Sequence, residues 1–276
     1  MKMVKKILHG IAIALAIIWT LFPIYWIVVT SFKHEWEVLT WPPTPIPVHP
    51  TLENYVKLLT VDRFYIYIFN SLTVSIGATA LSIFLGSLAA YGLARIGVPR
   101  SFGNFFLLWI LIVRMLPPIV IAIPVFILLK TMGLLDTRLG LVIAYQVYTL
   151  PYVIWILFGF LSAMPRDIEE AALVDGATRV QALIYVVLPA MAPALVATFI
   201  LSMMLAWNEF LYALILINSP SKYTVTVIVA NYIQEFVIDW GRLAGAGLLS
   251  ALPILILSIY IQKYMIRGLA FGGIKA

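Results

Sequence analysis

The stretch Glu169 to Pro189, EEAALVDGATRVQALIYVVLP, separates two long apolar segments of the chain. It begins with acidic residues, has a glycine near its centre and ends in proline. Asp167 followed by Glu170 has the spacing of a capping box, with Asp in place of Ser or Thr, and Thr178 has a glutamine at the same spacing. Gly176 lies between the two boxes, where a left-handed residue would end the first helix. The pattern predicts two short helices joined by a turn at the glycine.

The two predicted helices have different surfaces. In the second, apolar residues recur at the helical spacing and predict one buried stripe: Val180, Leu183, Ile184 and Val187. The first carries more acids than bases, unlike helices that lie on anionic lipid. Its small residues Ala171 and Ala172 would let another protein approach closely. The pair therefore either contacts a partner protein or packs beneath its own helix bundle.

The composition indicates a protein whose solvent is lipid. Of 276 residues, 63% are hydrophobic and only 11% are charged, against about 25% charged in a soluble domain. The net charge of +6 forms no basic stripe with interleaved aromatic residues, so no nucleic-acid partner is expected. Cysteine is absent, which excludes disulfides and thiolate metal sites. We expect an all-α membrane protein with a single domain over residues 1–276.

Six apolar segments are long enough to cross a bilayer as helices: Ile7–Thr30, Asn70–Ala94, Phe105–Leu129, Leu139–Leu161, Ala190–Ile217 and Ala244–Met265. The first is too long for a signal peptide and is expected to be retained. An even number of spans places both termini on one side, and the lysines before the first span favour the cytoplasm. The helix pair of residues 165–189 would then be cytoplasmic, between spans four and five.

Features within and between the spans allow further expectations. Small residues recur every four positions in the second span and predict close packing against a neighbouring helix: Ala78, Ser82, Gly86, Ala90 and Ala94. Prolines in several spans predict bent or broken helices. The long connections Ser31–Phe69 and Asn218–Leu243, both with aromatic residues, would either anchor the protein at the membrane surface or dock an external protein.

Catalytic and nucleotide-binding motifs are missing from the sequence. There is no G-x-x-x-x-G-K-[ST] loop to hold phosphates and no H-E-x-x-H pattern. The three histidines lie near the start of the first span or in the connection after it. We expect a chain that is not an enzyme and that binds no cofactor itself, so any ATP-driven step would take place on another subunit.

The central segment resembles the EAA motif of ABC importer permeases. The matching residues are Glu170, Ala171, Ala172, Gly176, Leu188 and Pro189, and Val186 stands where isoleucine is usual. Other stretches, among them TLENYVKLL, RMLPPIVIAIPVFILL, GLLDTRLGLVIAYQ, AWNEFLYAL and GLAFGGIKA, resemble the shorter, six-span permease of maltose/trehalose-type carbohydrate importers. In that family the EAA segment is a coupling helix, seated in a cleft of the ATPase.

The resemblance implies a non-catalytic permease subunit of an ATP-driven importer in a prokaryotic cell membrane. The cargo would be a sugar, expected to be a di- or oligosaccharide such as maltose or trehalose. The implied partners are a second, homologous permease, a dimer of ATPase subunits that bind ATP and Mg, and an extracytoplasmic sugar-binding protein. The residues expected at the ATPase contact are Glu170, Ala171, Ala172, Asp175 and Gly176.

Ionisable residues inside the spans are the remaining candidates for function. Arg114 lies in the third predicted span and Glu209 in the fifth, and because a charge in lipid is costly, each should face the bundle or a wet cavity. With Trp207 and Asn208, they would form either part of a translocation path for the sugar or a polar network between helices. The alternative function is a self-sufficient secondary carrier or channel for a small polar solute, which would need coupling-ion residues and usually internal repeats.

Overall fold

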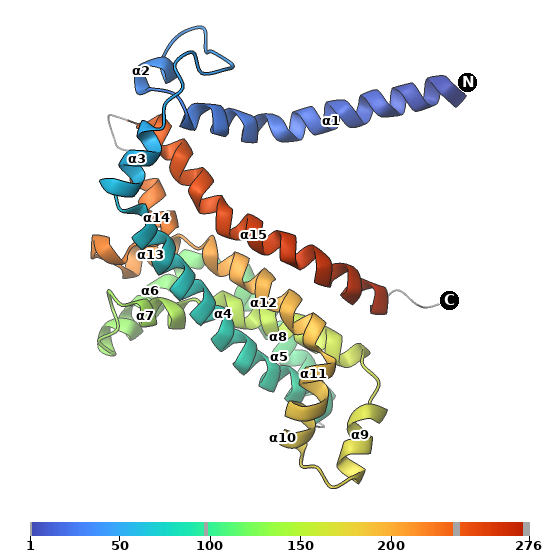
Figure 1. Ribbon diagram of the computed structural model, residues 1–276. Helices are drawn as coiled ribbons and strands as arrows, with labels where there is room; N and C mark the ends of the chain where they lie inside the picture. The colour runs from blue at the N-terminus through green and yellow to red at the C-terminus, as the bar shows by residue number, and fades with distance from the viewer. Residues whose placement is uncertain (1, 97–98, 234–237, 273–276) are drawn as a thin grey trace. The chain divides into compact units, whose positions relative to one another are not determined.

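The computed structural model describes residues 2–96, 99–233 and 238–272, which are almost entirely helical (Figure 1). The β structure of these ranges is one isolated bridge between Ile233 and Ile238. The all-α prediction is confirmed. The helices are α1 (Lys2–Ser31), α2 (Glu35–Val38), α3 (Glu53–Thr60), α4 (Phe64–Arg95), α5 (Arg100–Met115), α6 (Pro118–Thr131), α7 (Arg138–Ala144), α8 (Gln146–Ala163), α9 (Asp167–Val174), α10 (Arg179–Ala182), a π-helical turn (Leu183–Val187), α11 (Leu188–Ala190), α12 (Ala192–Trp207), α13 (Leu211–Leu216), a 3₁₀ turn (Pro220–Lys222), α14 (Val225–Ala230) and α15 (Trp240–Gly272).

Four of the described helices are long and apolar enough to cross a membrane unbroken: Lys5–Ser31, Phe64–Arg95, Gln146–Ala163 and Trp240–Ile259. Two further candidates are bent pairs. The pair Ser101–Met115 and Pro118–Thr131 bends by 99°, and the pair Arg179–Ala190 and Ala192–Trp207 bends by 78°. If each pair is one span, the described part of the chain holds six, the number that the hydropathy pattern predicts. The second pair differs from the predicted fifth span in its bounds, because it begins at Arg179, within the predicted cytoplasmic segment, and ends at Trp207 rather than Ile217.

The break in the third predicted span has a local cause. Pro117 has no N–H group, so it cannot continue the backbone hydrogen bonds of the helix. Leu116 before it is extended, with φ −66° and ψ 139°, which is the conformation favoured before proline. The helix therefore ends at Met115 and a new one begins at Pro118. The fourth predicted span is also divided, because Arg138–Ala144 forms the separate α7 and the long helix begins at Gln146.

The chain forms two compact units, and the first comprises the described residues of Met1–Ile66 and Ile228–Pro253. Its α2–α3 connection folds around the buried carboxylate of Glu37, which accepts hydrogen bonds from the backbone N–H of Val48 (2.7 Å) and His49 (3.3 Å) and from the Thr44 hydroxyl (3.1 Å). Burial raises the pKa of Glu37, but these donors and the charge of Lys33 outweigh burial and hold the pKa below its usual value. The proline-rich connection is thus ordered around one carboxylate.

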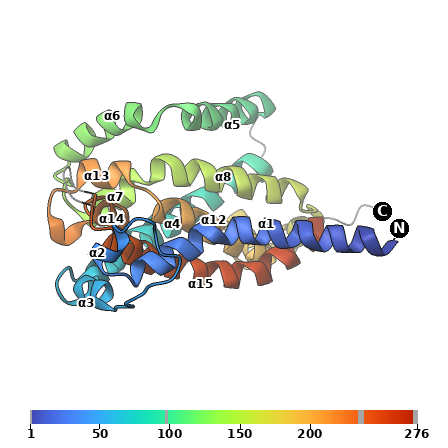
Figure 2. The same ribbon diagram turned by 90° about the horizontal axis from the view of Figure 1, so that it is seen from above.

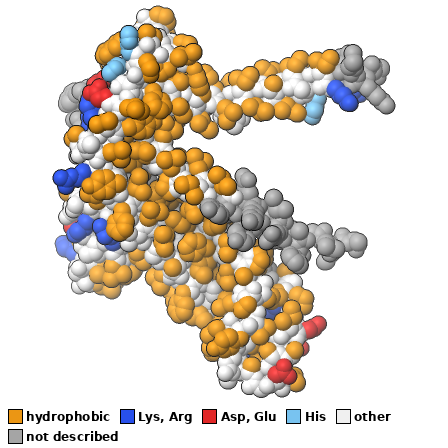
Figure 3. All heavy atoms as spheres, in the orientation of Figure 1, with side chains coloured by type: hydrophobic (Ala, Val, Ile, Leu, Met, Phe, Trp, Pro, Cys, Tyr) orange, Lys and Arg blue, Asp and Glu red, His pale blue; other side chains and the backbone are white. Residues whose placement is uncertain are grey.

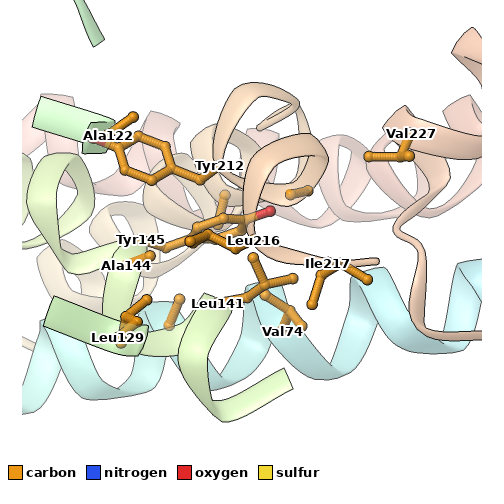
Figure 4. Close-up of a cluster of buried hydrophobic side chains, with 13 residues drawn as sticks. Val74, Ala122, Leu129, Leu141, Ala144, Tyr145, Tyr212, Leu216, Ile217 and Val227 are labelled. Carbon is orange, nitrogen blue, oxygen red and sulfur yellow. The ribbon is translucent and has the colours of Figure 1, made fainter. Parts of the chain in front are cut away.

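The second unit, Tyr67–Val227 with Ile254–Ala276, is organised around α4 and α8. One buried cluster joins these helices to α6, α7 and α13, with the rings of Tyr145 and Tyr212 near its centre (Figure 4). A second cluster, which includes Ala90, Leu157 and Leu183, joins the far part of α4 to α8 and the π-helical turn. Figure 2 shows α8 running beside α12, to which it also packs.

The predicted ridge of small residues on α4 forms the contact with α8. Ala78, Ser82 and Ala90 are fully buried, and a Cβ added at Gly86 would lie 2.6 Å from Cγ1 of Val153. Ser82 donates a 2.7 Å hydrogen bond to the side-chain carbonyl of Gln146. The interpretation of this ridge as internal packing is confirmed.

We expect Gly86→Ala to lower the stability of the protein by about 1 to 3 kcal/mol, because the new methyl group overpacks against a stiff β-branched neighbour. Gly92→Ala in the same helix is the matched control, since nothing lies within 4 Å of a Cβ at that position. Thermal unfolding in detergent micelles would compare the two, and Val153→Ala should rescue Gly86→Ala. An unfolding temperature for Gly86→Ala equal to that of Gly92→Ala would contradict this packing.

A group of polar contacts, here called the Asp136 clamp, joins two connections of the second unit. One connection lies between α6 and α7, and the other follows α13. The Asp136 carboxylate accepts hydrogen bonds from the Ser219 hydroxyl (2.5 Å) and from the backbone N–H of Ser219 (2.9 Å) and Asn218 (3.0 Å), and Lys222 lies 2.9 Å away. The bonds from Ser219, from Lys222 and from Asn218 hold the pKa of Asp136 far below its ordinary value, although burial opposes them.

Asp136→Asn should therefore destabilise the protein by about 1 to 3 kcal/mol, because a charged acceptor is lost. A carboxylate with a lowered folded pKa contributes stability that is complete above its unfolded pKa of about 3.9 and is lost only as the pH falls through the folded value. The difference between wild type and variant should hence stay constant from about pH 8 to pH 5. Unfolding followed at several pH values measures this, and a difference that disappears by pH 5 would contradict the clamp.

Candidate functional site

The predicted helix pair is present as α9 and α10 (Figure 1). The turn between the two helices is a complete C-capping motif. Gly176 has φ +90°. Its N–H donates to the carbonyl of Leu173 (3.1 Å), and the N–H of Ala177 donates to that of Ala172 (3.0 Å). These two bonds satisfy carbonyls at the end of α9 in the manner of a Schellman motif. The prediction that Gly176 ends the first helix is confirmed.

The first predicted cap is wrong by one residue. Arg166 is the N-cap, with no side-chain cap bond, and Asp167 is already the first helical residue. The N–H of Glu170 bonds to the Arg166 carbonyl at 2.9 Å rather than to an Asp167 side chain. Asp167, Glu169 and Glu170 in the first turn instead favour the helix through its dipole.

The second cap is confirmed, but the apolar stripe after it is only half right. Thr178 and Gln181 make both bonds of the capping box. The following turn, Leu183–Val187, is π-helical, so its hydrogen bonds span one more residue and the side-chain phase shifts. Leu183 and Val187 are buried as predicted, whereas Val180 and Ile184 are exposed.

The residues predicted to contact an ATPase lie mostly on the exposed face of the pair. Glu170, Ala171, Asp175 and Gly176 are exposed, and Ala172 is half-buried. Val174 is 87% exposed and was not among the predicted residues, although its place one turn after Glu170 marks the same face. Figure 3 shows acidic side chains where α9 lies, next to a mainly hydrophobic surface. This face is small, acidic and partly apolar.

The opposite face of α9 is attached to α4 by a residue that the sequence pattern did not single out. Glu169 is only 5% exposed. Its Oε2 lies 3.2 Å from Nε of Arg95, and its Oε1 accepts a 2.5 Å hydrogen bond from the Tyr91 hydroxyl. Adjacent residues of an α-helix point about 100° apart, so Glu169 and Glu170 lie on different faces, but the sequence does not reveal which of the two is buried.

Backbone contacts reinforce this attachment. Nη2 of Arg95 donates to the carbonyl of Met164 (2.8 Å), before α9, and Nη2 of Arg166 donates to the carbonyl of Ala94 (3.2 Å). The Tyr91 hydroxyl also lies 3.4 Å from the carbonyl of Arg179, in α10. The last turn of α4 therefore contacts residues before, within and after α9.

The predicted path residues of the fifth span lie at the break between α12 and α13. Trp207 is buried. Asn208 is exposed at the C-cap of α12, where its amide donates to the carbonyl of Met204 (2.8 Å). The Glu209 carboxylate accepts from the backbone N–H of Tyr212 (2.9 Å) and Ala213 (3.1 Å), so it caps the start of α13. Of the three, Asn208 is the exposed polar residue.

Arg114 lies elsewhere, in the last turn of α5. Its exposed guanidinium lies over the ring of Tyr152 in α8, 5.1 Å from the ring centroid, as in a cation–π contact. The possible ion pair of Arg114 with Glu209 is not among the ion pairs of the described residues. The structure thus joins Arg114 to an aromatic ring and Glu209 to a helix start.

A groove of about 690 Å³ lies beside the helix pair, between α8, α12 and the start of α9. Its lining is apolar and includes Trp155, Phe160, Ile168 and Met191. None of the predicted path residues lines it. Among the described residues, no group of three or more His, Cys, Asp or Glu side chains could hold a metal ion.

We expect Gly176→Ala to loosen the end of α9, because an L-residue forced into the left-handed region costs about 1 to 2 kcal/mol. Gly176→Asn should cost less, since asparagine tolerates this conformation. Nothing lies within 4 Å of a Cβ at this position, so size is not the cause. Amide hydrogen exchange over residues 172–178 should increase in the order wild type, Asn, Ala; an Asn variant that exchanges faster than the Ala variant would contradict the cap.

Known proteins match the chain over most of its length. The family described as binding-protein-dependent transport system inner membrane component matches residues 56–270. The sulfoquinovosyl glycerol transport system permease protein of Agrobacterium fabrum is 35% identical over 98% of this chain and 94% of its own length. The trehalose/maltose transport system permease protein of Thermococcus litoralis is 34% identical over 99% and 98%.

Solved structures agree with the fold. A chain of a bacterial ABC transporter involved in the import of the acidic polysaccharide alginate superposes with a TM-score of 0.80 at 21% identity, over 95% of this chain and 96% of that chain. The family match, the two relatives and the apolar helices identify a membrane-embedded, multi-pass protein. The chain belongs to the family of inner membrane components of binding-protein-dependent transport systems.

Proposed function

We propose that this chain is the transmembrane permease subunit of an ATP-driven ABC importer for a sugar or sugar derivative. The family match over residues 56–270 carries the proposal. Full-length relatives are named for sulfoquinovosyl glycerol, diacetylchitobiose and trehalose/maltose transport. These names support a glycosidic cargo, in which a sugar is joined to glycerol or to a second sugar.

The exposed face of α9 is the proposed contact with an ATPase subunit. Glu170, Ala171 and Asp175 are exposed, and the apolar Val174 projects from the same helix. A short helix with small and apolar residues on its free face suits a groove in a partner protein. The buried Glu169 fixes which face is free, because its ion pair holds the other side against α4.

The proposed orientation places α9 and both termini in the cytoplasm, with the connections after α1 and α13 on the other side. The lysines before α1 support this direction. The further partners would be a second permease, a second ATPase subunit and an extracytoplasmic sugar-binding protein. A related solved assembly is described as an alginate ABC transporter in complex with a periplasmic protein that binds an alginate pentasaccharide, which supports partners of this kind.

Two places in the second unit are proposed to line the sugar path. Asn208 offers an exposed amide at the break after α12, and Arg114 with Tyr152 offers a cation beside an aromatic ring. Trp207 and Glu209 would support the path rather than line it, since one is buried and the other caps α13. ATP and Mg would bind to the ATPase subunits, and no catalytic role is proposed for this chain.

Family membership decides between the two functions that the sequence left open. Inner membrane components of binding-protein-dependent systems work with other subunits, whereas a secondary carrier would transport alone. The chain is a permease of such a system, and the self-sufficient carrier or channel is rejected.

The ATPase contact can be tested by affinity purification of the tagged chain from membranes, followed by identification of the subunits that remain bound. We expect an ABC ATPase and a second permease to co-purify with wild type. Val174→Asp should lower retention of the ATPase by at least about tenfold, because a buried unpaired charge in an interface costs several kcal/mol.

Val61→Asp is the matched control, because Val61 is also highly exposed, at 70%, but lies at the end of α3. It should leave ATPase retention unchanged, and the second permease should stay bound in both variants. Equal retention of the ATPase by Val174→Asp and wild type would reject α9 as the contact, while co-purification of neither subunit with wild type would reject the importer itself.

A further inference from the structure

We propose that Glu169, Arg95 and Tyr91 form a joint that makes α4 follow the movements of α9, so that α4 acts as the rigid strut of this subunit. The inference rests on the proposed function, because it assumes that an ATPase moves α9. It adds the route by which that movement enters the membrane helices. Four features of the structure support it.

The first feature is the chemistry of the contact. The side chains of Glu169 and Arg95 are 6% and 5% exposed, and their closest atoms are 3.2 Å apart. A buried ion pair is seldom more stable than well-packed apolar residues, but removing one partner is strongly destabilising. The same carboxylate accepts a 2.5 Å hydrogen bond from the Tyr91 hydroxyl, and a hydrogen bond to a charged group is directional and geometrically specific. Such a pair resists sliding between α4 and α9 where apolar surfaces would permit it.

The second feature is the number of attachments at one place. Arg95 reaches the carbonyl of Met164, Arg166 reaches the carbonyl of Ala94, and Tyr91 reaches both Glu169 and the carbonyl of Arg179. The attachments therefore run in both directions between α4 and the segment that carries α9. A rotation of α9 about any single bond would break the others.

The third feature is the flexibility of the backbone segments that connect α9 to α8 and to α12. Towards α12, α9 is followed by the glycine turn at Gly176 and by the 78° bend between α11 and α12. Towards α8, it is preceded by the non-helical residues Met164 and Pro165. Short turns and breaks are where backbone angles absorb movement. The side-chain joint to α4 is thus the stiffer connection of α9.

The fourth feature is α4 itself. It is unbroken from Phe64 to Arg95, while the neighbouring spans α5–α6 and α11–α12 are bent. At its far end, Asn70 donates to the carbonyls of Ser221 and Tyr223, both at 2.9 Å, and Ser71 accepts from the N–H of Val225 (2.8 Å). From Asn70 to Arg95 the helix is about 38 Å long. One rigid helix hence links α9 to the connection after α13.

The test uses the complete transporter in lipid vesicles with its binding protein and sugar, and measures sugar taken up per ATP hydrolysed. Glu169→Gln and Arg95→Leu should each lower this ratio by about five- to tenfold, as expected when a coupling contact is lost. The exchanged pair Glu169→Arg with Arg95→Glu should recover part of it, because it restores the ion pair but not the hydrogen bond from Arg95 to the carbonyl of Met164. A merely structural role would reduce the amount of complex and leave the ratio unchanged.

Two further variants keep the test decisive if a charge variant fails to assemble. Tyr91→Phe removes only a hydroxyl and should lower the ratio by a smaller factor, about two- to threefold, because one hydrogen bond of the joint is lost while the ion pair remains. Arg242→Leu is the matched control, because Arg242 pairs with Asp62 and Asp239 in the first unit; it should reduce stability but keep the wild-type ratio.

The outcomes distinguish a failure of the proposed joint from a failure of the proposed function. If wild type couples uptake to ATP hydrolysis and Tyr91→Phe and the assembled charge variants keep the wild-type ratio, the joint is overturned. If wild type shows no ATP-dependent uptake, the proposed function fails instead. A lower ratio in Tyr91→Phe and in the single charge variants, partly recovered in the exchanged pair, supports the joint.

Discussion

Satisfying polar groups without water is the constraint on which this structure depends. In lipid, an unpaired N–H, carbonyl or charge costs several kcal/mol, so each must find a partner within the protein. The break after α12 meets this requirement through Glu209, which accepts from two N–H groups at the start of α13. At the end of α4 the charges of Arg95 and Glu169 compensate each other, and each side chain also makes a hydrogen bond, Arg95 to the carbonyl of Met164 and Glu169 to the Tyr91 hydroxyl. The amide nitrogen of Asn70 meets it by donating to two carbonyls of the connection after α13, while its buried Oδ1 has no hydrogen-bond partner among the described residues.

The same constraint separates rigid elements from hinges. Where helices are unbroken, as in α4, the backbone is satisfied internally and small residues allow the close contact of Gly86 with Val153. Where proline interrupts the ladder, as at Pro117, the chain bends by 99°. A permease that alternates between two states needs both kinds of element, and the side-chain contacts of α9 connect it to the rigid one.

Features of the helix pair that depend on neighbouring residues could be predicted from the sequence. The turn at Gly176 and the capping box at Thr178 involve atoms within a few positions of each other, and both are present. The predictions failed where distant residues or an unusual turn intervened. Arg166 replaces Asp167 as the cap while its side chain binds the carbonyl of Ala94 in α4, and a π-helical turn interrupts the expected stripe, in which Val180 and Ile184 are exposed. Neither effect leaves a pattern in the local sequence.

By itself, the sequence determined that the chain is helical, that lipid is its solvent, and that a capped helix pair lies between two apolar segments, because composition, hydrophobic length and capping are local properties. Only the tertiary structure decided which face of α9 is free. Glu169 and Glu170 are adjacent and chemically identical, but one is buried against Arg95 and the other is exposed. That choice depends on where α4 ends in space, which no short stretch of sequence encodes.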